Sequence, residues 1–159
     1  MDSSKLQKKY AIGERNFSQM DLSRKDLAWV NLSGADLSKA NLSEAKLSAA
    51  ILKGTDLKEA ILRKSILRAA DLTGTDLSGV DLSEVDFTGA DLTDTKLHGA
   101  SLSRANLSAV GSFKRVDLSA ANLSGANLRG LDLKTANLSG ANLSGANLDE
   151  ASFTETNMG

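Results

Sequence analysis

The chain has 159 residues, and its 19 basic and 20 acidic side chains leave a formal net charge of −1. A nearly neutral chain is not typical of a protein that binds nucleic acid or an anionic membrane through its general charge. It contains no cysteine, which excludes disulfides and thiolate metal sites. No apolar run is long enough for a signal peptide or a membrane span, so we expect a cytoplasmic protein.

The opening residues predict a short helix. Over residues 4–12, Leu6 and Tyr10 fall on one helical face, a serine precedes them as N-cap, and Gly13 is a favourable helix stop. A helix of this length is marginal in water by itself. We therefore expect it to dock as a cap on the structure that follows.

From residue 17 onward a large apolar side chain recurs at every fifth position. The series runs from residue 17 to residue 107, shifts by one, and resumes from residue 113 to residue 158. A step of five advances about 500° around a helix, so the side chains would spread over every face. In a flat strand an odd step would alternate between the two faces. The chain must therefore turn a corner in every pentad, as in a four-sided coil of about 20 residues whose leucines all point inward.

The remaining positions of each pentad agree with this geometry. Ala35 precedes the central Leu37 by two and shares its inward side, where only a small side chain fits beside the leucines. Asp36 and Ser38, on either side of Leu37, point outward. Glycines such as Gly34 recur at the corner position, where we expect a positive φ.

This pattern resembles the A(D/N)LSx consensus of the pentapeptide repeat family. Residues 35–38, 126–128 and 141–145 match the consensus, and the resemblance extends over residues 15–158. It implies an all-β solenoid, a right-handed quadrilateral β-helix with four pentads per coil and about seven coils in all. Residues 1–14 would be the N-terminal cap and residues 15–159 a single β-helical domain, because no proline or linker interrupts them.

A second, shorter resemblance is to cyanobacterial members of the family. They often begin with the pattern Tyr-x-x-Gly-x-Arg-x-Phe, which corresponds here to Tyr10, Gly13, Arg15 and Phe17.

The two ends of the predicted coil stack differ. The first coil has oversized residues in its small inward positions, Arg15, Met20 and Lys25, so we expect an irregular opening coil. At the other end Phe153 and Met158 close the apolar column with no dedicated cap. A bare terminal coil favours pairing, so we predict that any homodimer forms through these two residues.

One complete coil, residues 50–69, departs from the consensus by carrying isoleucines and cations on its outside. Single exposed isoleucines are common on protein surfaces and can result from random sequence variation. Several isoleucines in one coil, surrounded by cations, instead favour contact with a partner protein. The candidate contact residues of this basic coil are Ile51, Lys53, Lys58, Ile61, Arg63, Lys64, Ile66 and Arg68.

An acidic band follows the basic coil. Residues 69–95 contain no lysine or arginine, and a role in solubility is the simplest interpretation. Its seven acids are Asp71, Asp76, Asp81, Glu84, Asp86, Asp91 and Asp94.

Two smaller departures follow from the same lattice. The spacing of six between Leu107 and Phe113 requires one residue near Val110 to bulge out of the coil. Trp29, the sole tryptophan, occupies a corner, and we expect it to pack under the N-terminal cap.

No residue pattern points to catalysis. The single histidine, His98, lies in an outward position, and no phosphate loop, metal-ligand spacing or carboxylate pair stands out from the repeat.

We predict a non-enzymatic, rigid protein-interaction rod without cofactor or metal and without direct binding to nucleic acid or membrane; its specific partner is unknown. The alternative is the DNA mimicry of the family's fluoroquinolone-resistance members, which occupy the DNA site of gyrase; the acidic band favours it and the basic coil opposes it.

Overall fold

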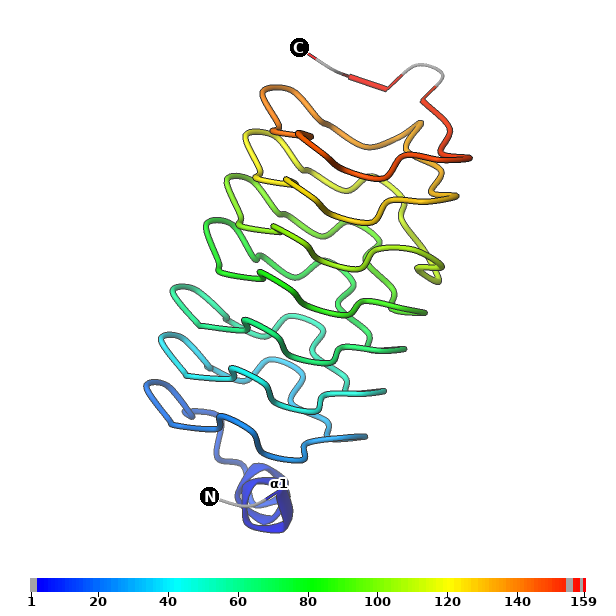
Figure 1. The fold of residues 1–159 in the computed structure, drawn as a ribbon. Coiled ribbons are helices and arrows are strands. Elements are labelled where there is room, and N and C mark those ends of the chain that lie inside the picture. Colours follow the sequence, from blue (N-terminus) through cyan, green and yellow to red (C-terminus); the bar gives the residue numbers. More distant parts are fainter. Residues whose placement is uncertain (1–2, 154–155, 158) are drawn as a thin grey trace.

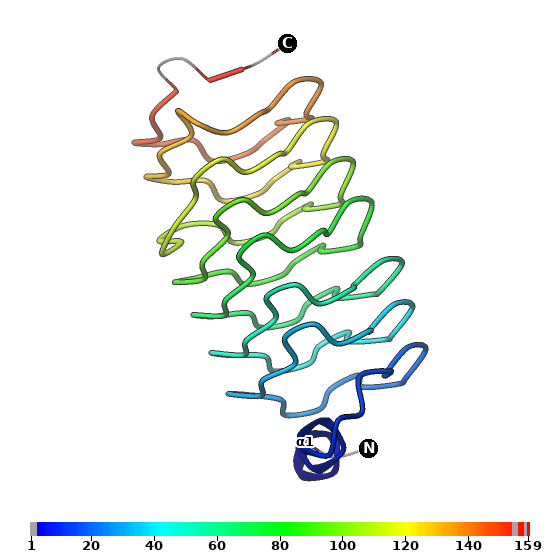
Figure 2. The ribbon, with the colours of Figure 1, turned by 180° about the vertical axis from the view of Figure 1, so that it is seen from behind.

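The computed structural model describes residues 3–153, 156–157 and 159. The helix α1, Ser3–Ala11, lies at one end of a stack of coils, and the chain's last residues lie at the other (Figure 1). The view from behind shows the same order (Figure 2). The coils are held together by parallel β-bridges, each confined to one residue pair.

The bridges define a coil of four faces. They pair residues twenty apart, from Asn16 with Asp36 to Asn137 with Asn157, with a shift to twenty-one on passing residue 111. This confirms the predicted twenty-residue period. We number the faces in chain order by the outward position that precedes each central residue, which is Asp or Asn in most pentads. Face 1 has positions 16, 36, 56, 76, 96, 117, 137 and 157; face 2 has 21, 41, 61, 81, 101, 122 and 142; face 3 has 26, 46, 66, 86, 106, 127 and 147; face 4 has 31, 51, 71, 91, 112, 132 and 152.

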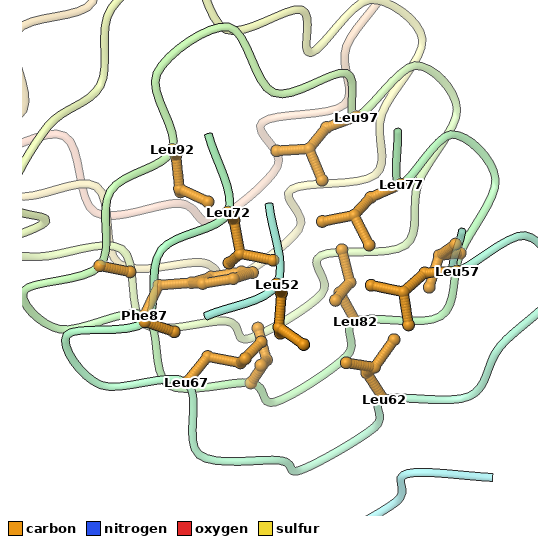
Figure 3. Close-up of a cluster of buried hydrophobic side chains, with 14 of the residues drawn as sticks. Leu52, Leu57, Leu62, Leu67, Leu72, Leu77, Leu82, Phe87, Leu92 and Leu97 are labelled. Carbon is orange, nitrogen blue, oxygen red and sulfur yellow. The ribbon is translucent and has the colours of Figure 1, made fainter. Parts of the chain in front are cut away.

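The interior is a continuous column of leucine. Leu57, Leu77 and Leu97 lie one above another, as the periodicity predicts (Figure 3), and all three are fully buried. Alanines in the small inward positions, such as Ala40 and Ala60, are buried between them. Removing a leucine side chain from water contributes about 1.5–3 kcal/mol before entropy is counted, so the column is the principal source of stability.

The corners adopt the left-handed backbone conformation expected of them. Gly34, Gly54 and Gly74 have φ values of 65°, 66° and 67°. The same conformation occurs at many corners that are not glycine, including Trp29 and Lys64, with φ of 63° and 60°. The fold therefore imposes strained backbone on ordinary side chains wherever a corner lacks glycine.

The outward Asp or Asn of each pentad is a turn residue as well as a polar surface group. Its Oδ1 accepts the backbone N–H two residues later, as in Asp21 with Ser23 at 3.0 Å, and Ser23 Oγ donates to the same oxygen at 2.6 Å. Asn41 and Ser43 repeat the arrangement. These local bonds explain why Ser follows the central leucine so often.

Face 1 contains a buried column of threonines in place of alanine. Thr55, Thr75 and Thr95 each donate a hydroxyl hydrogen bond of 3.0–3.1 Å to a leucine carbonyl of the preceding coil. On face 3 the corresponding Ser65 is also buried, but its hydroxyl has no hydrogen-bond partner.

The N-terminal helix docks on the first coil as predicted. Leu6 of α1 is fully buried in the leucine core, and the Tyr10 hydroxyl donates to the Ser33 carbonyl at 2.8 Å. Gly13 ends the helix with φ of 97°, and its N–H donates to the Tyr10 carbonyl at 3.0 Å. The Arg15 guanidinium stacks 3.8 Å from the centre of the Tyr10 ring.

The prediction of an inward Arg15 and Lys25 was wrong, because both side chains are exposed, and only Met20 is partly buried against the core. An unpaired charge in a leucine column would be strongly unfavourable. Leu6 of the helix supplies apolar contact at this end instead.

The expected bulge lies at Gly111. The N–H groups of Gly111 and Ser112 both donate to the Ala90 carbonyl, at 2.9 and 3.2 Å, so two residues oppose one. A Cβ at Gly111 would lie 2.7 Å from the Gly89 carbonyl oxygen. Only glycine fits here, and the reason is close approach of backbone; its φ is not positive.

The hydrogen-bond ladder between coils opens at two places. Each central residue from Phe17 to Leu138, all within the described part of the chain, donates its N–H to the next coil except Leu57 and Phe113. The bridges Asp56 with Asp76 and Ser112 with Asp132 are missing at the same places. We call these the face-1 opening and the face-4 opening; at the first, the teal and green coils stand further apart than their neighbours (Figures 1 and 2).

Candidate interaction surfaces

The outward residues of the basic coil are distributed around the whole circumference of the rod, and its isoleucines lie on three different faces. Ile51 is on face 4 and 39% exposed, Ile61 is on the opposite face 2 and 44% exposed, and Ile66 is half-buried on face 3. The predicted outward orientation of Ile61 is thus observed. One flat partner surface cannot contact all three isoleucines.

The corner between faces 2 and 3 brings four of the candidate residues together. Ile61 and Ile66 lie on the two faces that meet there, and Arg63 and Lys64 lie between them along the chain. Lys64 occupies the corner itself, with φ of 60°. Lys53 and Lys58 lie on other faces, so the structure does not gather the whole candidate set.

Cations of the basic coil pair with acids of the band above it. Arg63 and Lys64 both contact Glu84, at 3.0 and 3.6 Å, and Arg68 contacts Asp86 at 2.6 Å. The paired residues are 18–21 positions apart, one coil in sequence. Basic coil and acidic band therefore neutralise each other locally along this corner.

Hydrogen bonds lower the pKa values of several acids in and near the band. The pKa of Glu84 is lowered by its hydrogen bond from Arg63 and by the charges of Lys64 and Arg63. Burial opposes the charged form of Asp86, but bonds from Thr88 and Arg68 outweigh it and lower its pKa. Such acids stay ionised and partnered near neutral pH.

Trp29 does not pack under the cap. Its side chain is 78% exposed at the corner between faces 3 and 4, so that prediction was wrong. The corner turns its side chain outward, and Leu6 and Tyr10 already make the cap's contacts with the core. Ile12, at the end of the helix, is exposed as well, at 85%.

His98 has a surface environment. Its Nδ1 lies 2.9 Å from Ser119 Oγ, which in turn donates to Asp117 at 2.7 Å. The hydroxyl stands between the imidazole and the carboxylate, so the imidazole does not contact the carboxylate as it does in a catalytic triad. Within the described residues, no group of three His, Cys, Asp or Glu side chains could hold a metal ion.

The last described coil is the least covered part of the core. Leu143, Leu148 and Phe153 are only partly buried, although each packs against the core. The second predicted dimer residue, Met158, lies outside the described residues.

No helix in the described part of the chain is long and apolar enough to span a membrane.

A groove adjoins the bulge, at the face-4 opening. It has a volume of about 440 Å³. Its lining includes Val110, Phe113, Lys114, Leu131 and Asp132. The six-residue spacing in the sequence indicates the bulge. It does not indicate that the ladder opens, and the pentads around Leu57 and Asp76 follow the repeat without a break.

Together the twenty-residue bridges, the leucine column and the pentad turns define a repeat solenoid of four-sided coils. Matches to the family description "Pentapeptide repeats" occur in 8 copies, over residues 16–48, 40–79, 70–108, 112–148 and 132–159. The chain belongs to the pentapeptide repeat family. A comparison with curated protein sequences gave no significant match.

Solved structures similar to this chain are themselves pentapeptide repeat proteins. HetL, involved in heterocyst differentiation regulation in the cyanobacterium Nostoc sp. strain PCC 7120, is 32% identical over 95% of this chain and 94% of its own, with a TM-score of 0.42. Rfr23 from the cyanobacterium Cyanothece 51142 is 32% identical over 81% of this chain and 64% of its own, with a TM-score of 0.26.

A third similar structure is trypsin-treated QnrB1, a plasmid-mediated fluoroquinolone resistance protein. It is 19% identical over 83% of this chain and 64% of its own, with a TM-score of 0.53. At this identity the likeness concerns the fold alone.

Proposed function

We propose that the protein is a non-enzymatic, cytoplasmic interaction rod: residues 1–14 cap a right-handed quadrilateral β-helix of about seven coils, which presents its surface to a partner protein. The observation that carries the proposal is the corner where Ile61 and Ile66 flank Arg63 and Lys64. Apolar side chains next to arginine are a common composition of protein contact sites. The acids Glu84 and Asp86 hold the arginines in place beside them.

Affinity capture from the host's own extract tests this proposal. The wild type is compared with a variant carrying Ile61→Ser, Arg63→Ser, Lys64→Ser and Ile66→Ser. We expect a partner that the wild type retains and the variant loses. Arg104→Ser is the matched control, because Arg104 lies on the same edge of the rod outside the basic coil; equal capture by all three proteins would contradict the proposal.

The alternative function is inhibition of DNA gyrase or topoisomerase by DNA mimicry, for which the acidic band is the supporting feature. A DNA mimic presents negative charge along its contact surface. Here Glu84 and Asp86 are paired with cations of the basic coil, which weakens such a surface. We therefore expect no effect of the protein on gyrase supercoiling.

The gyrase assay also has a diagnostic variant. The five cations of the basic coil are replaced by serine, which removes the positive charge in the middle of the rod. Inhibition or drug protection of gyrase by the wild type, growing stronger in this variant, would reject the interaction rod in favour of the mimic. The replaced cations are Lys53, Lys58, Arg63, Lys64 and Arg68.

A further inference from the structure

The face-4 opening leaves backbone groups unpaired on both of its rims. On the lower rim, the Phe113 N–H lacks the bond to the next coil that most central residues make. On the upper rim, neither the backbone N–H nor the carbonyl of Asp132 is bonded, within the described residues. The Arg115 N–H is held by the Thr135 hydroxyl at 3.0 Å instead of by a carbonyl of the next coil. Each rim thus offers hydrogen-bonding backbone to a ligand.

An apolar floor lies beneath these rims. Phe113 and Leu131 line the groove and are 6% and 5% exposed, and Val110 lies beside them, half-buried. Leu131 occupies an inward position of face 4 where earlier coils have Ala70 and Ala90. The larger side chain, next to the Gly111 bulge, prevents the close stacking that alanine allows elsewhere. The space of about 440 Å³ is within the range of small-ligand sites.

The charge around the groove is positive. Lys114 lines the groove, and Lys134 has the equivalent outward position one coil later on face 4, two residues after the lining Asp132. Neither lysine forms an ion pair within the described residues. Arg115 makes two 2.6 Å bonds to Asp94. Asp132 is the acid among the lining residues, and its Oδ1 accepts the Lys134 N–H at 3.2 Å. The unpaired lysines favour an acidic ligand.

The face-1 opening also has unpaired backbone, at Leu57, but it lacks the apolar floor. Its space is smaller, about 250 Å³, and it is lined by glycine, threonine, aspartate and lysine residues with no large apolar side chain. Two stacked carboxylates, of Asp56 and Asp76, stand at its rims. Within the part of the chain that the structure describes, the face-4 opening is the one that combines unpaired backbone, an apolar floor and cations without an ion pair.

We propose that the face-4 opening binds an extended acidic peptide segment with one apolar side chain. A peptide unit carries one donor and one acceptor, so a single extended segment pairs with both rims, as strands do when they add to a sheet edge. Its apolar side chain packs on Phe113 and Leu131, and its flanking carboxylates approach Lys114 and Lys134. This site is separate from the basic coil, and its test is independent of the function proposed above.

Peptide titration of the full isotope-labelled chain, followed by NMR, tests the site. The probe is N-acetyl-Glu-Leu-Glu-amide, compared with N-acetyl-Lys-Leu-Lys-amide and N-acetyl-Glu-Gly-Glu-amide. We expect saturable shifts at the Phe113 and Asp132 amides with the first peptide, and at least about tenfold weaker binding of the other two. Equal binding of all three peptides, or shifts that spare these two amides, would overturn the proposal.

Two variants close or neutralise the site. Deleting Gly111 restores the five-residue register. We expect the ladder to pair across the opening and binding to be lost, while the thermal unfolding curve stays cooperative. The pair Lys114→Glu and Lys134→Glu keeps the opening and is expected to weaken binding about tenfold or more. Lys53→Glu, on the same face far below the opening, is the control that should bind as the wild type does.

Retained binding in the doubly charge-reversed variant would overturn the proposal even if the deletion variant failed to fold. The serine variant of the corner between faces 2 and 3 should bind the peptide normally. Loss of peptide binding in that corner variant would assign the peptide to the basic coil and reject the face-4 site.

Discussion

At the residue scale, equivalent inward positions carry different polar side chains with different consequences. The Thr75 hydroxyl has a partner in the Leu52 carbonyl at 3.1 Å, whereas the Ser65 hydroxyl is buried without one. A buried hydroxyl without a hydrogen bond loses its hydration and gains nothing in return. Alanine, the usual residue at this position, avoids that cost.

Ser65→Ala is therefore expected to raise the free energy of unfolding by about 1 kcal/mol. Thr75→Val, a replacement of similar shape that removes a satisfied donor, is expected to lower it by a similar amount. Urea unfolding followed by circular dichroism measures both. A Ser65→Ala chain less stable than the wild type would show that the hydroxyl has a partner in solution.

At the scale of the element, each coil is stabilised mainly by the leucines that it stacks on its neighbours. Leu77 is fully buried between Leu57 and Leu97. The coil above is held to it by bonds such as Leu77 N–H to the Lys96 carbonyl at 2.8 Å, whereas on the side of Leu57 the ladder is interrupted at the face-1 opening. Neighbouring coils therefore cannot collapse fully into a cavity.

Leu77→Ala is expected to cost about 2–5 kcal/mol of stability, because a residual cavity remains. Ile61→Ala, on the outside of the same stack, is expected to change stability by no more than about 0.5 kcal/mol. Chemical unfolding of both variants gives the comparison. Equal losses would be incompatible with the inward and outward assignment of the two positions.

At the scale of the whole molecule, the repeated Asp–Ser turns couple stability to pH. Hydrogen bonds from the serine two residues later, first from its hydroxyl, lower the pKa values of Asp36, Asp76 and Asp117 below the ordinary value of 3.8. The folded state therefore favours the ionised carboxylates. This stabilisation is complete above about pH 5 and is lost as the pH falls through the ordinary value and then the lowered pKa values.

Replacing these three aspartates by asparagine is expected to flatten the loss of stability at acid pH. Asparagine keeps the accepting Oδ1, as Asn41 shows in the same position, but it does not titrate in this range. Thermal midpoints measured from pH 7 down to pH 2.5 distinguish the two chains. An unchanged pH profile in the triple variant would assign acid unfolding to other groups.

The assembly of two rods is also a property of the whole molecule. Phe153 lies half-buried against the core in the last described coil. We expect any dimer of this chain to be lost on Phe153→Asp, because a charge cannot be buried unpaired in an apolar contact. Ile12→Asp, at the opposite end of the rod, should leave it intact. Sedimentation is the measurement; a wild-type monomer at high concentration, or a dimer lost only in Ile12→Asp, contradicts the prediction.

Surface contacts between coils could be predicted only in part. The positions of Arg63 and Glu84 in adjacent coils follow from the period, so their proximity was accessible from the sequence. The exposure of Trp29 and Arg15 was not, because it depends on how the helix α1 meets the first coil. The pattern likewise does not show that Ile51 and Ile61 lie on opposite faces unless the four-sided coil is built first.

The sequence by itself determined the period, the inward leucines, the cap and the location of the bulge, because each follows from local spacing and from the small volume available inside the coil. The tertiary structure alone decided where the ladder opens. Whether Phe113 and Asp132 pair depends on the combined volumes of Leu131 and its neighbours and on the backbone approach at Gly111. Such packing is a relation between coils, and no single pentad contains it.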